Sequence, residues 1–399
     1  MSKYALAPIV TLALLLGSTP AMNPPGNSQD LARPYADFGF DALRDLTSEH
    51  AQDNVFISPY SIAVSLAMLS NGADGTTRKA ILKTIHSQEQ SLESMNGANQ
   101  TLIEQINQTT AVQLAVANGL WIQKSAELNP TFTHVLQTSY AADAQNVDFR
   151  NPSAAETINT WVAKHTNGRI PKIVDQTDPT TLALLTNAIM FKGKWSLQFE
   201  PARTKPHDFK ATRGIHKVAM MENSAEYSYA NDSSSESIRL PYANGDFAMY
   251  VVLPHDASTL PAFVQGLTAE KFSTQIAQLR QRKGTIELPR FSLKYETALN
   301  TTLSKLGMGI AFGNRADFSG IPRRPTQLRI SDVRHATFLK VDEEGTEAAA
   351  ATTIGIMARA VRPSVPPFHM VVDHPFFLAI RDERSGQILF MGGIDDPQN

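Results

Sequence analysis

The segment from Glu343 to Met357 fits two incompatible secondary structures, and this constrains the fold more than any other stretch of the chain. Its four consecutive alanines, Ala348–Ala351, favour a surface helix, because alanine has the highest helix propensity. Read with the two-residue period of a strand, one face carries no charge and consists of Thr346, Ala348, Ala350, Thr352, Ile354 and Ile356. The segment therefore predicts an exposed loop or short helix that can also become a strand in a crowded sheet.

The chain that follows this segment reads as an irregular surface loop. Arg359, Arg362, Pro363, Pro366 and Pro367 come in short order, and prolines at this density prevent both regular helix and central strand. Loops of this kind lie on the surface and are the usual sites of proteolysis. We therefore expect a protease-accessible loop here.

Composition excludes several classes of function. The 399 residues include 42% hydrophobic and 19% charged residues, with no interior linker or repeat, so one large domain is the simplest organisation. The net charge of -2, with both signs interspersed, gives no electrostatic footprint for nucleic acid or an anionic membrane. With no cysteine, disulfides and thiol nucleophiles are excluded. The scattered histidines and the absence of His-Glu-x-x-His, Gly-x-Ser-x-Gly and phosphate-loop motifs argue against an enzyme, a metal or a cofactor.

The first 21 residues predict export. Lys3 precedes an apolar run, Ile9–Leu16, and small residues follow at Ser18–Ala21, which is the pattern of a secretory signal peptide cleaved after Ala21. The alternative is a buried N-terminal helix. No second apolar stretch is long enough to span a bilayer. We expect a protein secreted to the extracellular space or the periplasm.

Local patterns place helices early and strands late. Two further helices are predicted, over Ala154–His165 and Leu260–Leu279, and two further strands, over Thr285–Tyr295 and Phe368–Ile380. Val55–Ile57 reads as a short strand, Ser58 as a helix cap and Pro59 as the first residue of a buried helix. Leu182–Phe191 is apolar except at Thr186 and Asn187, as in a central strand covered on both faces. This order favours an α+β fold with large, mostly antiparallel sheets.

Four motifs, in the right order and with family-like separations, resemble the serpin family over essentially the whole mature chain. They are Asn54–Ile62, Thr186–Trp195, Ile330–Ala350 and, at the C-terminal end, His374–Arg381 with Ile388–Gly392. The resemblance implies a single metastable domain over residues 22–399, with three β-sheets, about nine helices and an exposed reactive-centre loop at about residues 343–366. It also implies a monomer.

The resemblance implies a suicide mechanism. A serine protease attacks the loop and forms an acyl-enzyme, the freed hinge inserts into the largest sheet, and the attached protease is trapped before deacylation. No residue of the serpin acts as acid or base. The hinge positions are Glu343, Gly345, Thr346, Glu347, Ala348, Ala349, Ala350 and Ala351.

Counting fourteen residues from Gly345, the spacing that the family implies, reaches Arg359 and gives Arg359–Ala360 as the reactive bond. An arginine there suits trypsin-like proteases, whose acidic pocket binds a guanidinium. The alternatives are that Arg359 is one solvated arginine among others, or that cleavage follows Arg362 because the stretch up to Pro375 is longer than usual.

Supporting residues are carried over position by position. Ser58, Ser61, Asn187 and His335 match the hydrogen-bonded cluster beneath the opening point of the sheet, although capping explains Ser58 and an ordinary buried imidazole explains His335 equally well. Trp195 matches the aromatic residue at the top of the sheet, with a core tryptophan as the alternative. Arg290 and Glu343 match a charged pair, which we predict to bond.

The sequence departs from the serpin pattern in two places that bear on function. Gly355 lies inside the segment that must become a strand, where glycine is unfavourable. The stretch Ser91–Thr110 contains no lysine or arginine, which argues against heparin-type activation. The alternative to an inhibitor is a non-inhibitory serpin acting as carrier, chaperone or storage protein, but such relatives commonly carry bulky or charged hinge residues.

Overall fold

The computed structural model describes residues 27–50, 52–256, 260–346 and 366–398. The predicted signal peptide and the part of the predicted reactive loop from residue 347 to 365 lie outside these ranges, including the hinge residues Glu347–Ala351, Gly355, Arg359, Ala360 and Arg362. The described part combines α-helices with two hydrogen-bonded sheets, which confirms the α+β prediction.

Nine α-helices occur in the described ranges, most of them in the first half of the chain. They are α1 (Ala32–Glu49), α2 (Pro59–Ser70), α3 (Gly75–Thr84), α4 (Leu92–Asn107), α5 (Pro130–Tyr140), α6 (Ala154–His165), α7 (Leu260–Gly266), α8 (Ala269–Ala277) and α9 (Asn300–Leu303). Helix α2 begins as predicted: the Ser58 side chain accepts a hydrogen bond from the Ser61 amide, and Pro59 takes the first turn. Every residue of α2 is buried, as its apolar sequence predicts.

The first sheet has six strands, and its centre is formed by β4 (Ala183–Lys194) and β11 (Asp332–Val341). These two strands run parallel, paired from Asp332 with Leu184 to Leu339 with Phe191. The other strands are β10 (Phe291–Ala298) beside β11, β2 (Val112–Gln123) beside β4, β3 (Asp143–Val147) beside β2, and the two-residue β12 (Gly345–Thr346), which pairs with β4.

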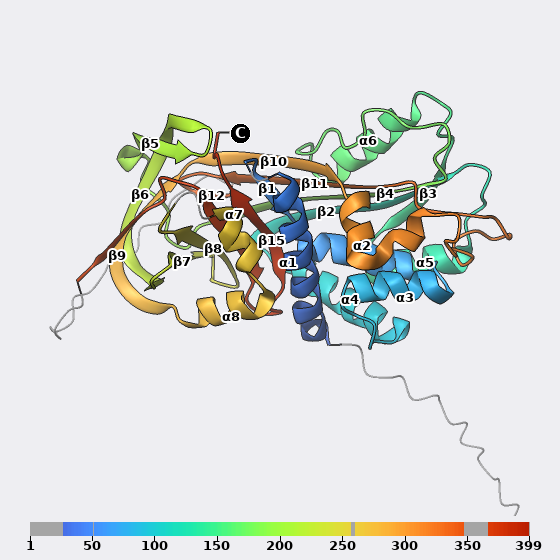
Figure 1. Cartoon of the computed structure of the whole chain (residues 1–399), viewed down its shortest axis with the longest axis horizontal. Coiled ribbons are helices and arrows are strands. Elements are labelled where there is room, and N and C mark those ends of the chain that lie inside the picture. Colours follow the sequence, from blue (N-terminus) through green and yellow to red (C-terminus); the bar gives the residue numbers. More distant parts are fainter. Residues whose placement is uncertain (1–26, 51, 257–259, 347–365, 399) are drawn as a thin grey trace, which may run out of the picture.

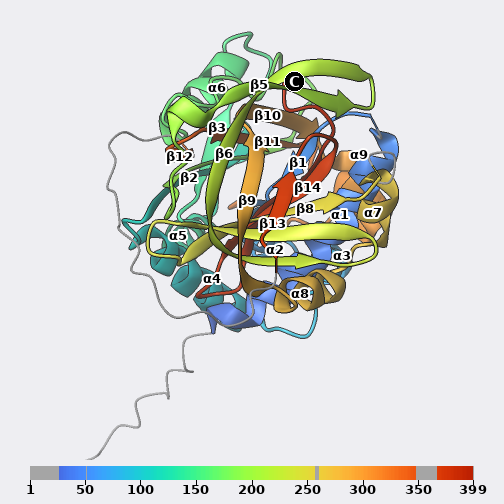
Figure 2. The ribbon, with the colours of Figure 1, turned by 90° about the vertical axis from the view of Figure 1, so that its left-hand side faces the viewer.

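The second sheet has nine strands and is antiparallel except for one pair, β9 with β13. Its strands are β1 (Val55–Ile57), β15 (Ile388–Ile394), β14 (Phe376–Asp382), β8 (Phe247–Pro254), β7 (Ser235–Tyr242), β6 (Gly214–Asn231), β9 (Arg280–Pro289), β13 (Phe368–Val371) and β5 (Lys205–Ala211), which pairs with β6. Where the resemblance implied three sheets, hydrogen bonds in the described part connect the strands into two, because the long β6 pairs with β9, β5 and β7 (Figure 2).

The six-stranded sheet lies between two layers of helices. Helix α6 covers one face, and α2, with α4 beside it, covers the other (Figure 1). Ile158 and Val162 of α6 pack on Ala188 of β4 and Phe338 of β11 in a small separate core. The opposite face joins the main core. Both faces of β4 are therefore buried, as predicted for Leu182–Phe191.

Three predicted elements are interrupted in the structure. The expected helix Leu260–Leu279 is two helices, because the Thr268 side chain caps α8 by accepting from the Lys271 amide. The expected strand Thr285–Tyr295 is split at Arg290, after Pro289, into β9 and β10. The expected strand Phe368–Ile380 is split between Val371 and Phe376, a stretch that includes Pro375. No helix in the described ranges is long and apolar enough to cross a membrane.

Candidate functional site

The hinge begins at the end of the β4–β11 pair where Phe191 pairs with Leu339, and we call this end the entrance. After Val341 the chain turns back through two hydrogen bonds, from the Asp342 amide to the Gly345 carbonyl (2.8 Å) and from the Gly345 amide to the Asp342 carbonyl (3.2 Å). Strand β12 then pairs antiparallel with β4, Gly345 with Lys194 and Thr346 with Gly193. On its other edge β4 pairs with β2, through Gly193 and Val112. Strand β12 therefore lies on the same edge of β4 that β11 occupies from Leu184 to Phe191.

Gly345 is required by this close approach. Its φ is +146°, and a Cβ placed there would lie 2.2 Å from the carbonyl oxygen of Gly193. A side chain at this position would force β12 off β4. The glycine that the sequence placed in the hinge therefore starts the pairing with the central sheet.

Trp195 follows the last residue of β4 and hydrogen-bonds to the turn at the entrance. Its ring stacks on Tyr242 with centroids 4.4 Å apart and an angle of 13° between planes. Its indole N–H donates to the Asp342 carbonyl (2.9 Å), and its backbone N–H donates to the Glu344 carbonyl (3.0 Å). The residue predicted at the top of the sheet thus contacts the hinge directly.

Glu343 bonds with Arg290 as predicted, and it has a second partner, Thr204, that was not predicted from the sequence. Its Oε1 accepts from the Thr204 hydroxyl at 2.7 Å and from the Arg290 guanidinium at 3.4 Å. Glu343 is 8% exposed, whereas the Arg290 side chain is 52% exposed. Water screens the ion pair at such exposure, so the Thr204 bond makes the better-defined contribution.

Replacing Glu343 by lysine is expected to destabilise the native protein by about 2–4 kcal/mol, because a buried ammonium would face Arg290 and leave the Thr204 hydroxyl without its acceptor. Thermal unfolding and native gels would measure the stability and any polymers formed. Arg290→Ala is the matched control, and it should lower the free energy of unfolding by less than about 1 kcal/mol. Unchanged stability and no polymers for the lysine variant would contradict the role of Glu343.

Asn187 lies at the centre of a buried polar cluster, where it meets Ser58, Ser61 and His335, as the family resemblance implied. His335 Nδ1 donates to Asn187 Oδ1 (2.6 Å), and His335 Nε2 accepts from the Ser58 amide (3.2 Å). The Asn187 amide donates to the Ser61 hydroxyl (2.5 Å) and the Ser61 carbonyl (3.0 Å). The cluster therefore ties β4 and β11 to the first turn of α2.

Two further members of the cluster were missed from the sequence. Asn118 of β2 pairs directly with Asn187 and accepts from its amide at 2.5 Å, and the Ser65 hydroxyl donates to the same Asn118 oxygen at 3.0 Å. A signal was present for both. Ser65 lies one helical turn after Ser61 in an otherwise apolar run, and Asn118 interrupts an apolar strand.

Burial keeps His335 neutral. The residue is fully buried, and desolvation of the charged form lowers the pKa of its imidazole to about 3. The neutral tautomer with its proton on Nδ1 satisfies both neighbours, since Nε2 must accept from Ser58. A proton on Nε2 would face the Ser58 amide and break this arrangement.

The geometry of the cluster makes it sensitive to strand separation. Asn187 and His335 are direct partners in the parallel β4–β11 register, and their side chains bond across it. Any strand that enters between β4 and β11 must break this bond. In the part of the chain that the structure describes, no group of three or more His, Asp or Glu side chains is arranged to hold a metal ion.

The family model for serpins (serine protease inhibitors) matches residues 33–397. The leukocyte elastase inhibitor of Bos taurus is 36% identical over 383 residues, covering 92% of this chain and all of that protein. Among solved structures, the thermophilic serpin tengpin aligns with a TM-score of 0.85 at 28% identity, and the alignment covers 96% of this chain and 97% of the tengpin chain. Human thyroxine-binding globulin aligns with a TM-score of 0.86 at 26% identity, and the alignment covers 93% of this chain and 100% of the globulin chain.

The chain therefore belongs to the serpin family. Serpins as a family are protease inhibitors and not enzymes. The α+β fold predicted from the sequence is the serpin fold, with the helices and large sheets of these structures.

Proposed function

We propose that this protein traps a trypsin-like serine protease, with Arg359–Ala360 as the reactive bond and insertion of the hinge between β4 and β11 as the trapping step. The protease serine attacks the carbonyl of Arg359, the amine of Ala360 leaves, and an ester joins protease and inhibitor. The hinge then extends β12 down β4. The protease is carried with it, and its active site is deformed before water can cleave the ester.

One observation carries this proposal: β12 is already paired with β4 at the entrance, while β4 and β11 still pair with each other below it. Continuation of β12 would exchange a parallel pairing of two strands for two antiparallel pairings with a third strand between them. Antiparallel pairs are slightly more stable per residue, and the number of ladder hydrogen bonds grows. The hinge supports this exchange, because Thr346, Ala348 and Ala350, which share one face of a strand, are small and uncharged.

A non-inhibitory carrier is the second candidate, favoured by the structural similarity to thyroxine-binding globulin. The uncharged hinge face argues for the inhibitor. Export through the signal peptide 1–21, and an extracellular or periplasmic target, are part of the proposal. The basic-residue-free helix α4 supports a mechanism without heparin.

The test is to mix the mature protein with trypsin, run a denaturing gel and sequence the released C-terminal peptide. We expect a band at the summed mass and a peptide that begins at Ala360. A peptide that begins at Pro363 would move the bond to Arg362. Cleavage without a stable complex for trypsin and for other serine proteases would favour the non-inhibitory alternative.

A further inference from the structure

The six-stranded sheet carries a group of cationic side chains on its α6 side, at the entrance end. Met190 of β4 and Phe338 of β11 belong to the core beneath α6. Because side chains alternate along a strand, Lys192 and Lys340, each two residues further on, lie on this same face. Lys294 of β10 shares the face, since it pairs directly with Phe338.

A fourth cation reaches the same place from the connection that follows α6. The guanidinium carbon of Arg169 lies 5.7 Å from the centroid of the Phe338 ring. We call Lys192, Lys294, Lys340 and Arg169 the basic patch. Lys294 and Arg169 are exposed, while Lys192 and Lys340 are half-buried, so a solute can contact all four.

The positive charge of the basic patch is only partly neutralised. Lys340 is paired with Asp342 at 3.1 Å, and Glu296 lies two residues after Lys294 on the same face of β10. Lys192 and Lys294 have no ion-pair partner among the described residues. Four cations against two carboxylates leave a net positive surface.

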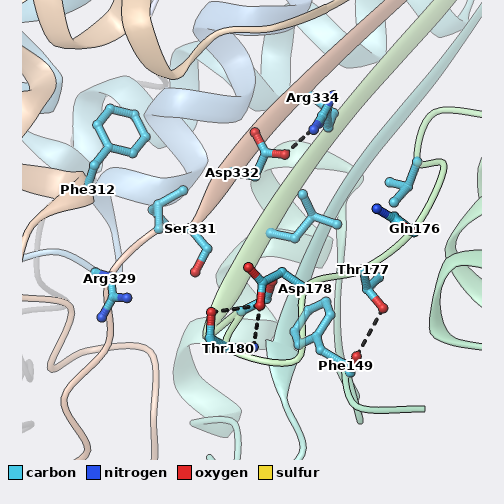
Figure 3. Close-up of a pocket in the computed structure, with 14 residues that line it drawn as sticks. Phe149, Gln176, Thr177, Asp178, Thr180, Phe312, Arg329, Ser331, Asp332 and Arg334 are labelled. Carbon is cyan, nitrogen blue, oxygen red and sulfur yellow. Dashed lines mark hydrogen bonds and ion pairs between the residues drawn. The ribbon is translucent and has the colours of Figure 1, made fainter. Parts of the chain in front are cut away.

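The other end of the β4–β11 pair has a balanced charge. A pocket of about 340 Å³ lies there, and charges of both signs line it, namely Asp178 and Asp332 with Arg329 and Arg334 (Figure 3). Asp332 and Arg334 are paired at 2.5 Å. Of the two ends of this strand pair, the entrance end is therefore the one that attracts anions.

Two lysines of the basic patch stand side by side on the strands β4 and β11. Lys192 and Lys340 directly follow Phe191 and Leu339, the last residues that pair these strands. Neighbouring strands lie about 4.8 Å apart, so the two ammonium groups repel each other across the strand pair. A multivalent anion that contacts both lysines would replace this repulsion by attraction and hold β4 and β11 together.

We propose that the basic patch binds inorganic polyphosphate, and that the bound chain stabilises the closed β4–β11 pair. Lysine ammonium groups are compact charges with three rotatable donors, which suit phosphate oxygens. A single exposed ion pair contributes little in water, so the ligand must offer several charges in succession, as a chain of phosphates does. Because the patch consists of lysines and one arginine on a native surface, this binding does not depend on the proposed trapping of a protease.

The experiment follows thermal unfolding at low salt, with and without millimolar tripolyphosphate, for the wild type and two double variants. Lys192→Gln with Lys294→Gln removes two charges of the patch and breaks no ion pair of the described residues. Lys79→Gln with Lys83→Gln is the matched control, because both lysines are exposed on α3, on the other side of the sheet from α6 (Figure 1). We expect tripolyphosphate to raise the unfolding midpoint of the wild type and the control by about 2 °C, and that of the patch variant by less than about 1 °C.

Titration calorimetry checks the binding directly. Tripolyphosphate should bind the wild type saturably and more weakly as sodium chloride is added, and the patch variant should bind it at least about fivefold more weakly. Equal midpoint shifts in all three proteins would overturn the proposal, since they would reflect the general exclusion of phosphate from protein surfaces. An equal shift of the wild type by a short polyglutamate at the same ionic strength would overturn phosphate as the ligand and indicate a surface for acidic peptides.

Discussion

Replacing Ala350 by glutamate is expected to convert this protein from a trap into a substrate of its target protease. The β12 register, continued down β4, sets Ala350 opposite Ile189, which is fully buried and faces the main core. An unpaired carboxylate buried against that face would raise the free energy of the inserted strand by several kcal/mol. A barrier higher by about 3 kcal/mol slows insertion roughly 150-fold, so water would hydrolyse the ester first.

The measurement is the number of inhibitor molecules cleaved for each protease molecule inactivated. We expect this ratio to rise by at least about tenfold for Ala350→Glu, with little complex on a denaturing gel. Glu347→Gln is the matched control. In the same register Glu347 lies opposite the half-buried Lys192, where a glutamine can be solvated, so the ratio should stay near that of the wild type. An Ala350→Glu variant that traps as efficiently as the wild type would rule out insertion in this register.

Elements with strong local signals could be predicted from the sequence alone. Helix α6 has the predicted bounds Ala154–His165, and α2 begins at the predicted cap, because Ser58 and Pro59 act within one helical turn. The central strand was recognisable because both of its faces are apolar. The meeting of Ser58, Ser61, Asn187 and His335 followed from the family resemblance, since no local pattern joins residues so far apart in the sequence.

What could not be predicted depends on contacts between distant segments. Thr204 precedes β5 and reaches Glu343 only because the folded chain brings the two together, so no spacing rule links them. The joining of strands into two sheets depends on the pairing partners of β6, which its own sequence does not specify. The docking of Gly345 likewise depends on a distant segment, because a Cβ at this position would lie against the Gly193 carbonyl oxygen of β4.

The entrance and the polar cluster lie along one path between β4 and β11. At the entrance Gly345 begins the new pairing, and midway the Asn187–His335 bond holds the old one. Inserted in register, Thr352 would come opposite Asn187, and its hydroxyl could replace the imidazole as a partner. In the proposed mechanism the cluster sets how readily β4 and β11 part, while the hinge face sets whether insertion can be completed.

The native protein is expected to lose stability in mild acid through His335, and His335→Gln should remove this part of the loss. The folded pKa of about 3 lies below the ordinary value of 6.5, so the unfolded chain binds the proton more tightly. The contribution of His335 to the free energy of unfolding is therefore fully present above pH 6.5 and declines as the pH falls towards 3. This contribution falls by up to about 1.4 kcal/mol per pH unit, so the loss reaches about 2 kcal/mol at pH 5.

Urea unfolding at pH 7.5 and pH 5 for the wild type, His335→Gln and His134→Gln separates this effect from that of the carboxylates. His134 is exposed on α5, so its variant should show the full acid loss of the wild type. His335→Gln should be less stable at pH 7.5, because a flexible amide replaces a ring that satisfies Ser58 and Asn187 together, but its acid loss should be smaller by about 2 kcal/mol. Equal acid losses in all three proteins would show that His335 is not kept neutral by the fold. Polymers that appear at pH 5 in the wild type and not in His335→Gln would instead link protonation at the cluster to the parting of β4 and β11.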